Sequence, residues 1–420
     1  MTKEHGLLLI KDFILKKDSA VDGNEPYPIS LRCINWVKFL SKYKIHDLEI
    51  NNILYSDIVF LSKNLEFHLL GNHLLENAFS LLFGSYYFQD INLYRKSKQL
   101  IEKELNEQIL NDGGHFELSP MYHQILFFRL LDSINLIKLN ESWIIDDFVI
   151  FLEKKARLMC SWLKHITYQN GEIPMVNDST YMIAPSSKNL FIYSKKIGVY
   201  SVLQPLSVSG YRKITKEKYE LFVDIGNIGP DYQPGHAHSD TFNFELRLDK
   251  LPFFVDTGIS TYEKNQIRKN ERSTVSHNTV MVNNIEQSDA WGGFRVGRRA
   301  KILNIIENES QIAAYHNGYK NLGIIHERTF KWNNNRIEIK DSLNKPSKAK
   351  AFFHFHSSIN KPRIENATLV LDDLRVNISF SNHSKIEIQT YKLSHGFNLR
   401  KSAFKVVVSF NQTLLTEIHL

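Results

Sequence analysis

The sequence is poor in cysteine: its 420 residues include two, Cys33 and Cys160. Neither belongs to a Cys-x-x-Cys pair, which excludes a zinc ribbon and a thioredoxin-type redox motif. One disulfide between them is conceivable. We expect two buried free thiols instead, because isolated cysteines commonly serve as small apolar core residues.

The sequence also lacks a long apolar run. No stretch reaches the roughly 18 uninterrupted apolar residues that a membrane-spanning helix needs. The first residues hold a short apolar patch that Lys11 and Asp12 interrupt, without the apolar core and small-residue cleavage site of a signal peptide. The sequence therefore predicts no membrane span and, as given, a cytoplasmic protein. A periplasmic location would follow if an upstream segment were missing.

Dense runs of one charge are absent as well. The chain has 52 Lys and Arg residues against 45 Asp and Glu, a formal net charge of +7. We interpret this mainly as a solvated surface with a slight excess of Lys; the alternative is attraction to an acidic glycan, a nucleic acid or a membrane face. RNA-binding aromatic signatures are missing. The Gly-x-x-Gly pieces lack the strand and helix context of a phosphate loop, so we predict no nucleic-acid partner.

From residue 30 to about 170, apolar residues recur at helical spacing. The period runs from Val59 to Phe88, through Leu61, Leu65, Leu69, Leu74, Ala78 and Leu82. Further helices are expected over 92–110, 121–139 and 144–166. The 92–110 helix should stop at an Asn-Asp-Gly-Gly signal, and the next should start with Ser119 as N-cap and Pro120 as first residue. Short connections between such helices predict α/α hairpins, and no internal repeat supports a regular solenoid.

After about residue 200 the period changes to two. Apolar and polar residues alternate over 241–248, 336–340, 351–356 and 385–389, while β-branched and aromatic residues dominate 219–225, 278–282 and 405–410. Short strands between Asn, Gly, Ser and Asp turns predict an antiparallel sandwich. We place the boundary between about 180 and 215, which gives a helical domain over 1–200 and a β-sandwich domain over 201–420.

The densest group of chemically active side chains lies in residues 234–240, PGHAHSD. On an extended backbone His236, His238 and Asp240 would point to one side, because side chains alternate along a strand. Two imidazoles one residue apart suit a metal or a reacting group. For this spacing alone, however, hydrogen-bonded polar residues at strand ends are the favoured interpretation.

A metal site needs more ligands than this segment provides. Asp256 and His277 lie in later predicted strands, and His238, Asp256 and His277 would form a familiar Zn²⁺ set if those strands adjoin. No compact His-x-x-x-His helix ties these ligands together, so the spacing is a weak signal.

The helical half offers two further groups. On the helix around residue 72, Asn72 lies one turn from Glu76, and His73 one turn from Asn77. Polar residues in so apolar a helix either form an inter-helix network or line a cleft, because an unpaired buried amide costs roughly 1–3 kcal/mol.

The second group is residues 112–123, DGGHFELSPMYH, which include Glu117 and place Tyr122 and His123 in the first turn of a helix. A phenol there can transfer a proton if cations lower its pKa from about 10. Taken alone, such a tyrosine is more often a packed aromatic.

A last group is Trp291 with Arg295, set among glycines over 291–299. An indole and a guanidinium suit sugar stacking and carboxylate pairing. The alternative is a basic turn that enters the next strand.

Taken together, the segments resemble the heparinase II/III superfamily of polysaccharide lyases, and most closely the members encoded among bacterial surface-polysaccharide genes. The resemblance covers about residues 27–299 and more loosely the rest. It rests on 27–36 (YPISLRCINW), 70–77 (LGNHLLEN), 112–123, 234–240 and 272–279 (RSTVSHNT). It implies an α+β multidomain fold, an incomplete α/α toroid followed by an antiparallel β-sandwich. It also implies β-elimination on a uronate-containing acidic polysaccharide.

Residue roles carry over by matching positions. Asn72 would neutralise the uronate carboxylate, His73 would assist or act as base, Tyr122 would transfer the proton, and His236 would be the second catalytic imidazole. The resemblance also implies a largely structural Zn²⁺ on His238, Asp256 and His277. Substrate contacts are expected from side chains around these groups: Glu76, Glu117, His123, Trp291 and Arg295.

The chain departs from the family in two respects. It shows no secretion signal, and its helical half starts close to what is mid-domain in longer relatives, so we expect a shortened toroid. Two alternatives to a lyase stay open. One is a non-catalytic glycan-binding or polysaccharide-assembly protein that retains the fold. The other is a zinc hydrolase, which would need the metal exposed in the cleft beside a carboxylate base. The sugar itself stays open among heparosan-like, alginate-like and other uronate polymers.

Overall fold

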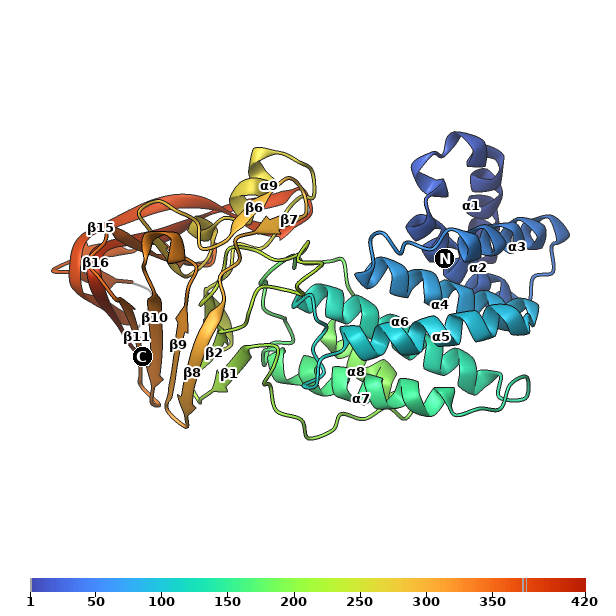
Figure 1. Ribbon diagram of the computed structural model, residues 1–420, viewed down its shortest axis with the longest axis horizontal. Coiled ribbons are helices and arrows are strands. Elements are labelled where there is room, and N and C mark those ends of the chain that lie inside the picture. Colours follow the sequence, from blue (N-terminus) through green and yellow to red (C-terminus); the bar gives the residue numbers. More distant parts are fainter. Residues whose placement is uncertain (1, 372–373, 375) are drawn as a thin grey trace. The chain divides into compact units, whose positions relative to one another are not determined.

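The computed structural model describes residues 2–371, 374 and 376–420. The chain forms two compact units. The first contains Met1–Leu110, Leu126–Cys160 and Phe191–Ser201; the second contains Asn111–Ile125, Ser161–Leu190 and Val202–Leu420. Long helices dominate the chain up to Lys196, and strands dominate it from Tyr211 onward, as the colours of Figure 1 show.

The helical region follows the period found in the sequence. Its helices are α1 (Lys3–Lys16), α2 (Pro26–Tyr43), α3 (Leu48–Lys63), α4 (Gly71–Phe88), α5 (Ile91–Gln108), α6 (Pro120–Leu139), α7 (Phe148–Ile166) and α8 (Ser187–Lys196). Short 3-10 turns at Lys17–Ser19 and Asp22–Asn24 follow α1. The predicted helices over 92–110, 121–139 and 144–166 are confirmed as α5, α6 and α7, whereas α1 and α8 were not predicted.

The period from Val59 to Phe88 does not form one continuous helix. α3 ends at Lys63, where Asn64 leaves the helical conformation with φ −126° and ψ 46°. α4 begins only after Leu70, where Leu70 and Gly71 adopt φ angles of 57° and 54°, in the left-handed region that a right-handed helix does not use. The Glu66 carbonyl accepts the backbone N–H groups of Leu69 and Leu70, which closes the intervening turn. Apolar spacing alone did not reveal this break, since leucines lie on both sides of it.

The second unit contains the strands: β1 (Tyr211–Thr215), β2 (Tyr219–Asp224), β3 (Phe244–Leu248), β4 (Leu251–Phe254), β5 (Val280–Val282), β6 (Asp289–Trp291), β7 (Arg295–Gly297), β8 (Ile302–Asn308), β9 (Gln311–His316), β10 (His326–Trp332), β11 (Arg336–Leu343), β12 (Ala349–His354), β13 (Arg363–Glu365), β14 (Thr368–Val370), β15 (Asn377–Gly396) and β16 (Leu399–His419). It also holds α9 (Gln266–Glu271) and the 3-10 turns Thr274–Ser276 and Lys320–Leu322. Each stretch predicted as a strand from alternation, or from its β-branched and aromatic content, overlaps one of these elements.

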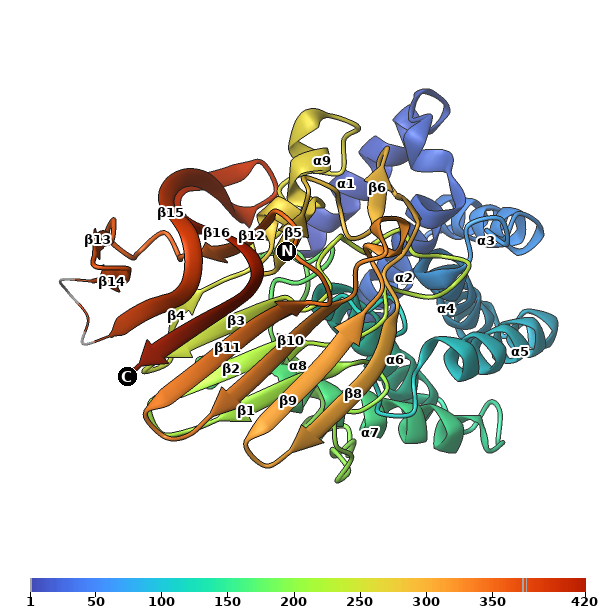
Figure 2. The ribbon, with the colours of Figure 1, turned by 60° about the vertical axis from the view of Figure 1, so that its left-hand side comes forward.

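The strands form antiparallel sheets that face each other. One has the order β1-β2-β3-β4, and the other runs β13-β14-β15-β16-β11-β10-β9-β8, with β12 and β5 attached beside β16. Figure 2 shows β1–β3 layered behind β9–β11. Their common core includes Leu221 and Phe244 from the first sheet and Phe330, Phe353 and Val406 from the second, all fully buried. Each such side chain contributes roughly 1.5–3 kcal/mol through burial, so this core holds the sandwich together.

Two simpler expectations can be compared with the structure. Cys33 and Cys160 are both buried free thiols. Among the described residues, no helix is long and apolar enough to cross a membrane.

Candidate active site and metal centre

Tyr122 and His236 stack on each other in the second unit. Ser119 caps α6 as predicted: its hydroxyl accepts the backbone N–H of Tyr122 at 3.3 Å, and its carbonyl accepts that of His123 at 2.9 Å. This cap places Tyr122 in the first helical turn. The Tyr122 ring lies over the His236 ring, with centroids 4.1 Å apart at an angle of 37°. The structure therefore brings together two residues that are far apart in the sequence and were both predicted to be catalytic.

Carboxylates surround the His236 imidazole. Its Nε2 lies 3.7 Å from Oε2 of Glu117, and its Nδ1 lies 2.8 Å from Oδ2 of Asp178. Burial by itself disfavours the charged imidazolium, but Glu117 and Asp178 outweigh it and raise the pKa of His236 above its ordinary value. The His236 side chain is 11% exposed, so it keeps a small accessible edge.

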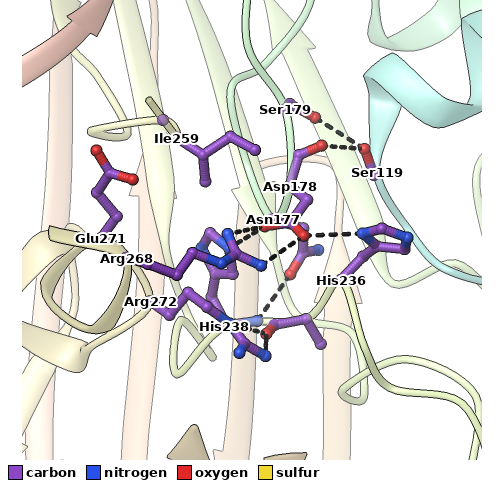
Figure 3. Close-up of polar contacts among 12 residues, drawn as sticks. Ser119, Asn177, Asp178, Ser179, His236, His238, Ile259, Arg268, Glu271 and Arg272 are labelled. Carbon is purple, nitrogen blue, oxygen red and sulfur yellow. Dashed lines mark hydrogen bonds and ion pairs between the residues drawn. The ribbon is translucent and has the colours of Figure 1, made fainter. Parts of the chain in front are cut away.

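Asp178 is the hub of this region (Figure 3). Its fully buried carboxylate binds the Arg268 guanidinium through both oxygens, and it also contacts His236 and Nε2 of His238, the latter at 2.9 Å. Burial would raise the pKa of Asp178, but Arg268 and the two imidazoles hold it well below its usual range. Asp178 was not predicted as a site residue.

Two arginines, one in α9 and one directly after it, bind the loop of residues 234–240 that carries His236 and His238 (the histidine loop). Arg272, which follows α9, donates to the carbonyl of Ala237 at 2.9 Å and to that of Gly293 at 2.9 Å. Arg268 Nε also donates to the Gly293 carbonyl, at 3.1 Å. The guanidinium groups therefore join the histidine loop to the turn between β6 and β7.

The expectation of an extended strand over residues 234–240 is wrong. The segment is a loop, with a turn in which the N–H of Ala237 donates to the carbonyl of Pro234 at 3.1 Å. His236 and His238 still share one direction, because both reach Asp178. Asp240 belongs to a different group, described next.

Asp240, Asp256 and His277 form a buried group with the geometry of a metal site. Each offers one ligand atom, and these atoms lie within 4.8 Å of one another. Asp256 follows β4, and His277 follows the turn Thr274–Ser276. Oδ2 of Asp256 lies 2.7 Å from Nδ1 of His277. Asp256 and His277 were predicted as ligands, whereas Asp240 was not.

His238 stands beside this group. Its ring centroid lies 5.3 Å from that of His277. Two imidazoles on one tetrahedral zinc would have centroids about 5 Å apart, given zinc–nitrogen bonds of about 2.0 Å. Burial lowers the pKa of His238 to about 3, which favours the neutral imidazole that a metal requires.

Three fully buried polar atoms beside one another are suited to bind a cation. Within the described residues, Nδ1 of His238, Oδ2 of Asp240 and Nε2 of His277 have no hydrogen-bond partner. Burying such an atom unpaired costs roughly 1–3 kcal/mol. The pKa of Asp240 is raised to about 6, mainly by burial and further by the nearby Asp256 carboxylate. The donor set therefore fits a divalent ion of the zinc type, with nitrogen and oxygen ligands.

The predicted residues of α4 lie in the first unit. Nδ1 of His73 lies 3.1 Å from Oε1 of Glu66, and its ring packs against Tyr27 with centroids 4.5 Å apart. The Asn77 amide donates to Glu66 at 2.8 Å and to the Ser30 hydroxyl at 3.0 Å. The sequence places His73 one turn from Asn77, but in the structure His73 is paired with Glu66.

Two further α4 side chains are buried. Asn72 is 6% exposed, and Glu76 is 1% exposed with Oε1 2.6 Å from Arg129. Burial raises the pKa of Glu76, and the Arg129 charge opposes that shift. The Glu76 carboxylate is thus engaged by α6, and its predicted contact with substrate stays a prediction.

His123 is also engaged within the protein. It is fully buried, stacks on Trp162 with centroids 4.4 Å apart, and its Nδ1 accepts the backbone N–H of His115 at 3.3 Å. Its predicted role in substrate binding likewise stays a prediction.

Trp291 and Arg295 face each other across the β6–β7 hairpin. The indole lies over Gly297, where an added Cβ would meet the ring at 3.1 Å, and it is 48% exposed. At the tip of this hairpin, Phe294 contacts the His236 ring, with centroids 5.7 Å apart. The hairpin therefore offers exposed aromatic surface beside His236.

Sequence reasoning missed several residues that complete the site. Tyr262 places its hydroxyl 3.1 Å from that of Tyr122, and the Arg268 guanidinium lies 5.1 Å from the Tyr262 ring. Asp178 carried one usable signal, an Asn-Asp-Ser turn directly after the apolar Ile-Pro-Met-Val over 173–176. Nothing local distinguishes Arg268 from the other arginines.

A helical region followed by facing antiparallel sheets is the toroid-plus-sandwich class of fold. Two family descriptions match this chain: "Heparinase II/III N-terminus" over residues 35–200 and "Heparinase II/III-like, C-terminal" over residues 202–419. The chain belongs to the heparinase II/III-like family.

Individual relatives are distant. A heparin-sulfate lyase of Bacteroides stercoris is 24% identical over 351 residues, which are 76% of this chain and 50% of that protein. The chain therefore spans about half the length of this relative. The crystal structure of heparinase III aligns with a TM-score of 0.71 at 16% identity, over 94% of this chain and 69% of that one. The heparan sulfate lyase HepC of Pedobacter heparinus gives 0.67 at 18% identity, over 94% and 68%.

Proposed function

We propose that this protein is a polysaccharide lyase that cleaves a uronate-containing acidic glycan by β-elimination. The stacked pair of Tyr122 and His236, with Asp178 behind the imidazole, is the observation that supports it best. A phenol and an imidazole in contact are the groups that proton abstraction beside a carboxylate requires.

The proposed chemistry begins at C5 of a 4-linked uronate. This proton becomes removable when the adjacent carboxylate is neutralised, because negative charge develops there as the proton leaves. We assign that neutralisation to His236, whose raised pKa favours the cationic form. The roles of Asn72 and His73, which lie in the first unit, stay predictions from the sequence. Tyr122 takes the C5 proton and returns a proton to the departing O4 when both lie on the same face.

We assign the metal to the neighbouring buried group. Asp240, Asp256, His277 and His238 would hold Zn²⁺, with Asp240 as the addition to the predicted set. Such an ion would fix these side chains and neutralise the buried carboxylates. The ligands are at most 3% exposed, which favours a structural ion over the exposed, water-activating zinc of a hydrolase.

A glycosaminoglycan is the proposed substrate. The net charge of +7 suits a polyanion, and two relatives bear the name heparin-sulfate lyase, so heparan-type polymers come first. We assign sugar stacking to Trp291 and pairing with acidic groups to Arg295, the exposed residues of the β6–β7 hairpin. We assign a substrate contact to Glu117 as well, whose Oε2 lies 3.7 Å from Nε2 of His236.

The test is ultraviolet absorbance during incubation with heparan sulfate, heparin, chondroitin, hyaluronan and alginate. β-Elimination leaves a C4–C5 double bond conjugated to the carboxylate, so one of these polymers should give a steady rise. A folded, zinc-loaded protein that binds one of them without a rise would overturn the lyase assignment in favour of a glycan-binding role.

A further inference from the structure

The Asp178 carboxylate divides its two oxygens between the two histidines of the loop. Oδ2 contacts Nδ1 of His236 at 2.8 Å, and Oδ1 contacts Nε2 of His238 at 2.9 Å. The Arg268 guanidinium binds both oxygens from a third direction, as Figure 3 shows. One buried carboxylate therefore touches the imidazole assigned to catalysis and an imidazole assigned to the metal.

The backbone around Asp178 is fixed by the same neighbours. Its N–H donates to the carbonyl of His236 at 3.1 Å, and its carbonyl accepts the Ser119 hydroxyl at 2.8 Å. The Asn177 side chain accepts the N–H of His238 at 3.2 Å. Because the main chain and the side chains are both held, the carboxylate has little freedom to turn away from either ring.

This geometry decides where each imidazole carries its proton. A carboxylate paired with arginine has no proton and only accepts hydrogen bonds. His236 must therefore donate from Nδ1, and His238 must donate from Nε2. These bonds leave Nε2 of His236 on the side of Glu117, and they leave Nδ1 of His238 as a lone-pair donor.

The remaining nitrogen of His238 needs a partner of its own. It is fully buried, and no hydrogen-bond donor reaches it from the described residues. A metal ion can bind the lone pair of a buried imidazole nitrogen that carries no proton. A carboxylate behind the opposite nitrogen is the usual arrangement for a metal-bound histidine, since it fixes the ring and strengthens the lone pair.

We propose that Asp178 is a positioning residue that fixes both tautomers and couples the metal centre to His236. A metal on His238 draws electron density from that ring, so its Nε2–H binds Asp178 more strongly. The shared carboxylate then binds His236 less strongly, without any contact between His236 and the metal. Any effect of Asp178 on the elimination reaction rests on the proposed lyase function, whereas the tautomers and the coupling do not.

The first experiment uses the wild-type protein with ¹⁵N-labelled histidine. Two-bond ¹⁵N–¹H correlation spectra at mildly alkaline pH report which ring nitrogen carries the proton, and H236Q and H238Q assign the signals. We expect a proton on Nδ1 of neutral His236 and on Nε2 of His238. A proton on Nδ1 of His238 in the metal-free protein would overturn the proposal.

The second experiment adds Zn²⁺ to metal-free protein. We expect the ring nitrogens of His238 to shift strongly and those of His236 to shift as well in the wild type. In D178N the His236 response should disappear, and Zn²⁺ affinity should fall about 10- to 100-fold, as is typical when an outer-shell partner is lost. An unchanged His236 response or an unchanged affinity in D178N contradicts the coupling.

A matched control separates positioning from stability. Asp341 is an equally buried carboxylate in the same unit that binds His326 and Arg328. D341N should lose stability as D178N does, yet keep the His236 and His238 tautomers and the Zn²⁺ affinity. If D178N does not fold, D178E and the wild-type spectra still decide the question.

The two proposals fail in different ways. Tautomers and coupling as expected, with no elimination on any polymer, would reject the lyase and leave Asp178 as assigned. Normal elimination by a D178N protein with unchanged tautomers would reject the positioning role and leave the lyase standing.

Discussion

The second unit contains two buried centres of the same composition. In one, Asp178 joins Arg268 to His236 and His238; in the other, Asp341 joins Arg328 to His326, whose ring contacts His316. Both carboxylates and both guanidinium groups are fully buried. In both centres, arginine and histidine hold the pKa of the aspartate below its usual value against the effect of burial.

The two centres differ in what the remaining imidazole nitrogens do. At Asp341 every nitrogen is used: His326 Nδ1 lies 2.9 Å from His316 Nε2, and His316 Nδ1 accepts the N–H of Gly318 at 3.0 Å. At Asp178, Nδ1 of His238 receives no hydrogen bond from the described residues, and His236 keeps an exposed edge. Residue types alone therefore do not mark a functional site; unfilled bonding capacity does.

The largest expected effect is a loss of kcat, and it should separate two tyrosines that lie beside the two centres. Tyr122 stacks on His236, and Tyr319 contacts His316 with centroids 5.7 Å apart. We expect Y122F to lower kcat by about 10²- to 10⁴-fold, the usual contribution of a proton-transferring group, with fold and metal content unchanged. Y319F should keep kcat and lose about 1 kcal/mol of stability, because its hydroxyl donates to the Val280 carbonyl. Equal kcat values for Y122F and the wild type would break the comparison.

The next effect concerns metal content. H238A should weaken Zn²⁺ binding by more than the about 10- to 100-fold that loss of an outer-shell partner costs, because a direct ligand is removed. H326A should keep its zinc, although it disrupts the other centre. Elemental analysis of both variants after dialysis measures this, and zinc retained by H238A would remove His238 from the ligand set.

Acid stability sharpens the comparison from the side of Asp341. Despite burial, Arg328 and His326 lower the pKa of Asp341 to about 2, against about 3.9 in an unfolded chain. The folded state thus favours the carboxylate and gains roughly 2–3 kcal/mol. That gain is fully present above the unfolded pKa and is lost as the pH falls through the folded one. Urea unfolding at pH values from neutral to acid should show a shallower decline for D341N; an unchanged slope would contradict the assignment.

The smallest effect is expected at the hairpin beside the Asp178 centre. W291A removes a half-exposed indole, and aromatic stacking contributes roughly 0.5–1.5 kcal/mol. KM should therefore rise about two- to tenfold while kcat stays close to the wild-type value. L303A, at an equally exposed position on β8, should leave both constants unchanged. A fall in kcat without a change in KM would place Trp291 in the chemistry instead.

The sequence predicted the sheets well because alternation reports burial directly, as in β3 and β11. It predicted Tyr122 in the first turn of α6 because Ser119 and Pro120 form a local start signal. The division between α3 and α4 was not predicted, since the break depends on the backbone conformation of Asn64 and on the positive φ angles of Leu70 and Gly71. Apolar period carries no information about such a turn.

The site was predictable only in part, for a related reason. Family motifs bring out His236 and Tyr122, whose neighbours in the sequence are distinctive. The roles of Asp178 and Arg268 depend on contacts with residues 58 to 90 positions away, and no local sequence pattern indicates such contacts. Asp240 lies within the motif, but its placement with Asp256 and His277 required the loop to turn away from a strand.

The same long separations have a consequence for folding. Contacts between Asp178 and Ser119, His236 and Arg268 close loops of 59, 58 and 90 residues, and each closure costs chain entropy before any contact forms. The hub therefore has no nucleus of its own and can assemble only after the sheets have brought these segments together. The recovery of native tryptophan fluorescence during refolding should thus precede Zn²⁺ uptake, and His236 and His238 should be among the last groups to reach their native environment.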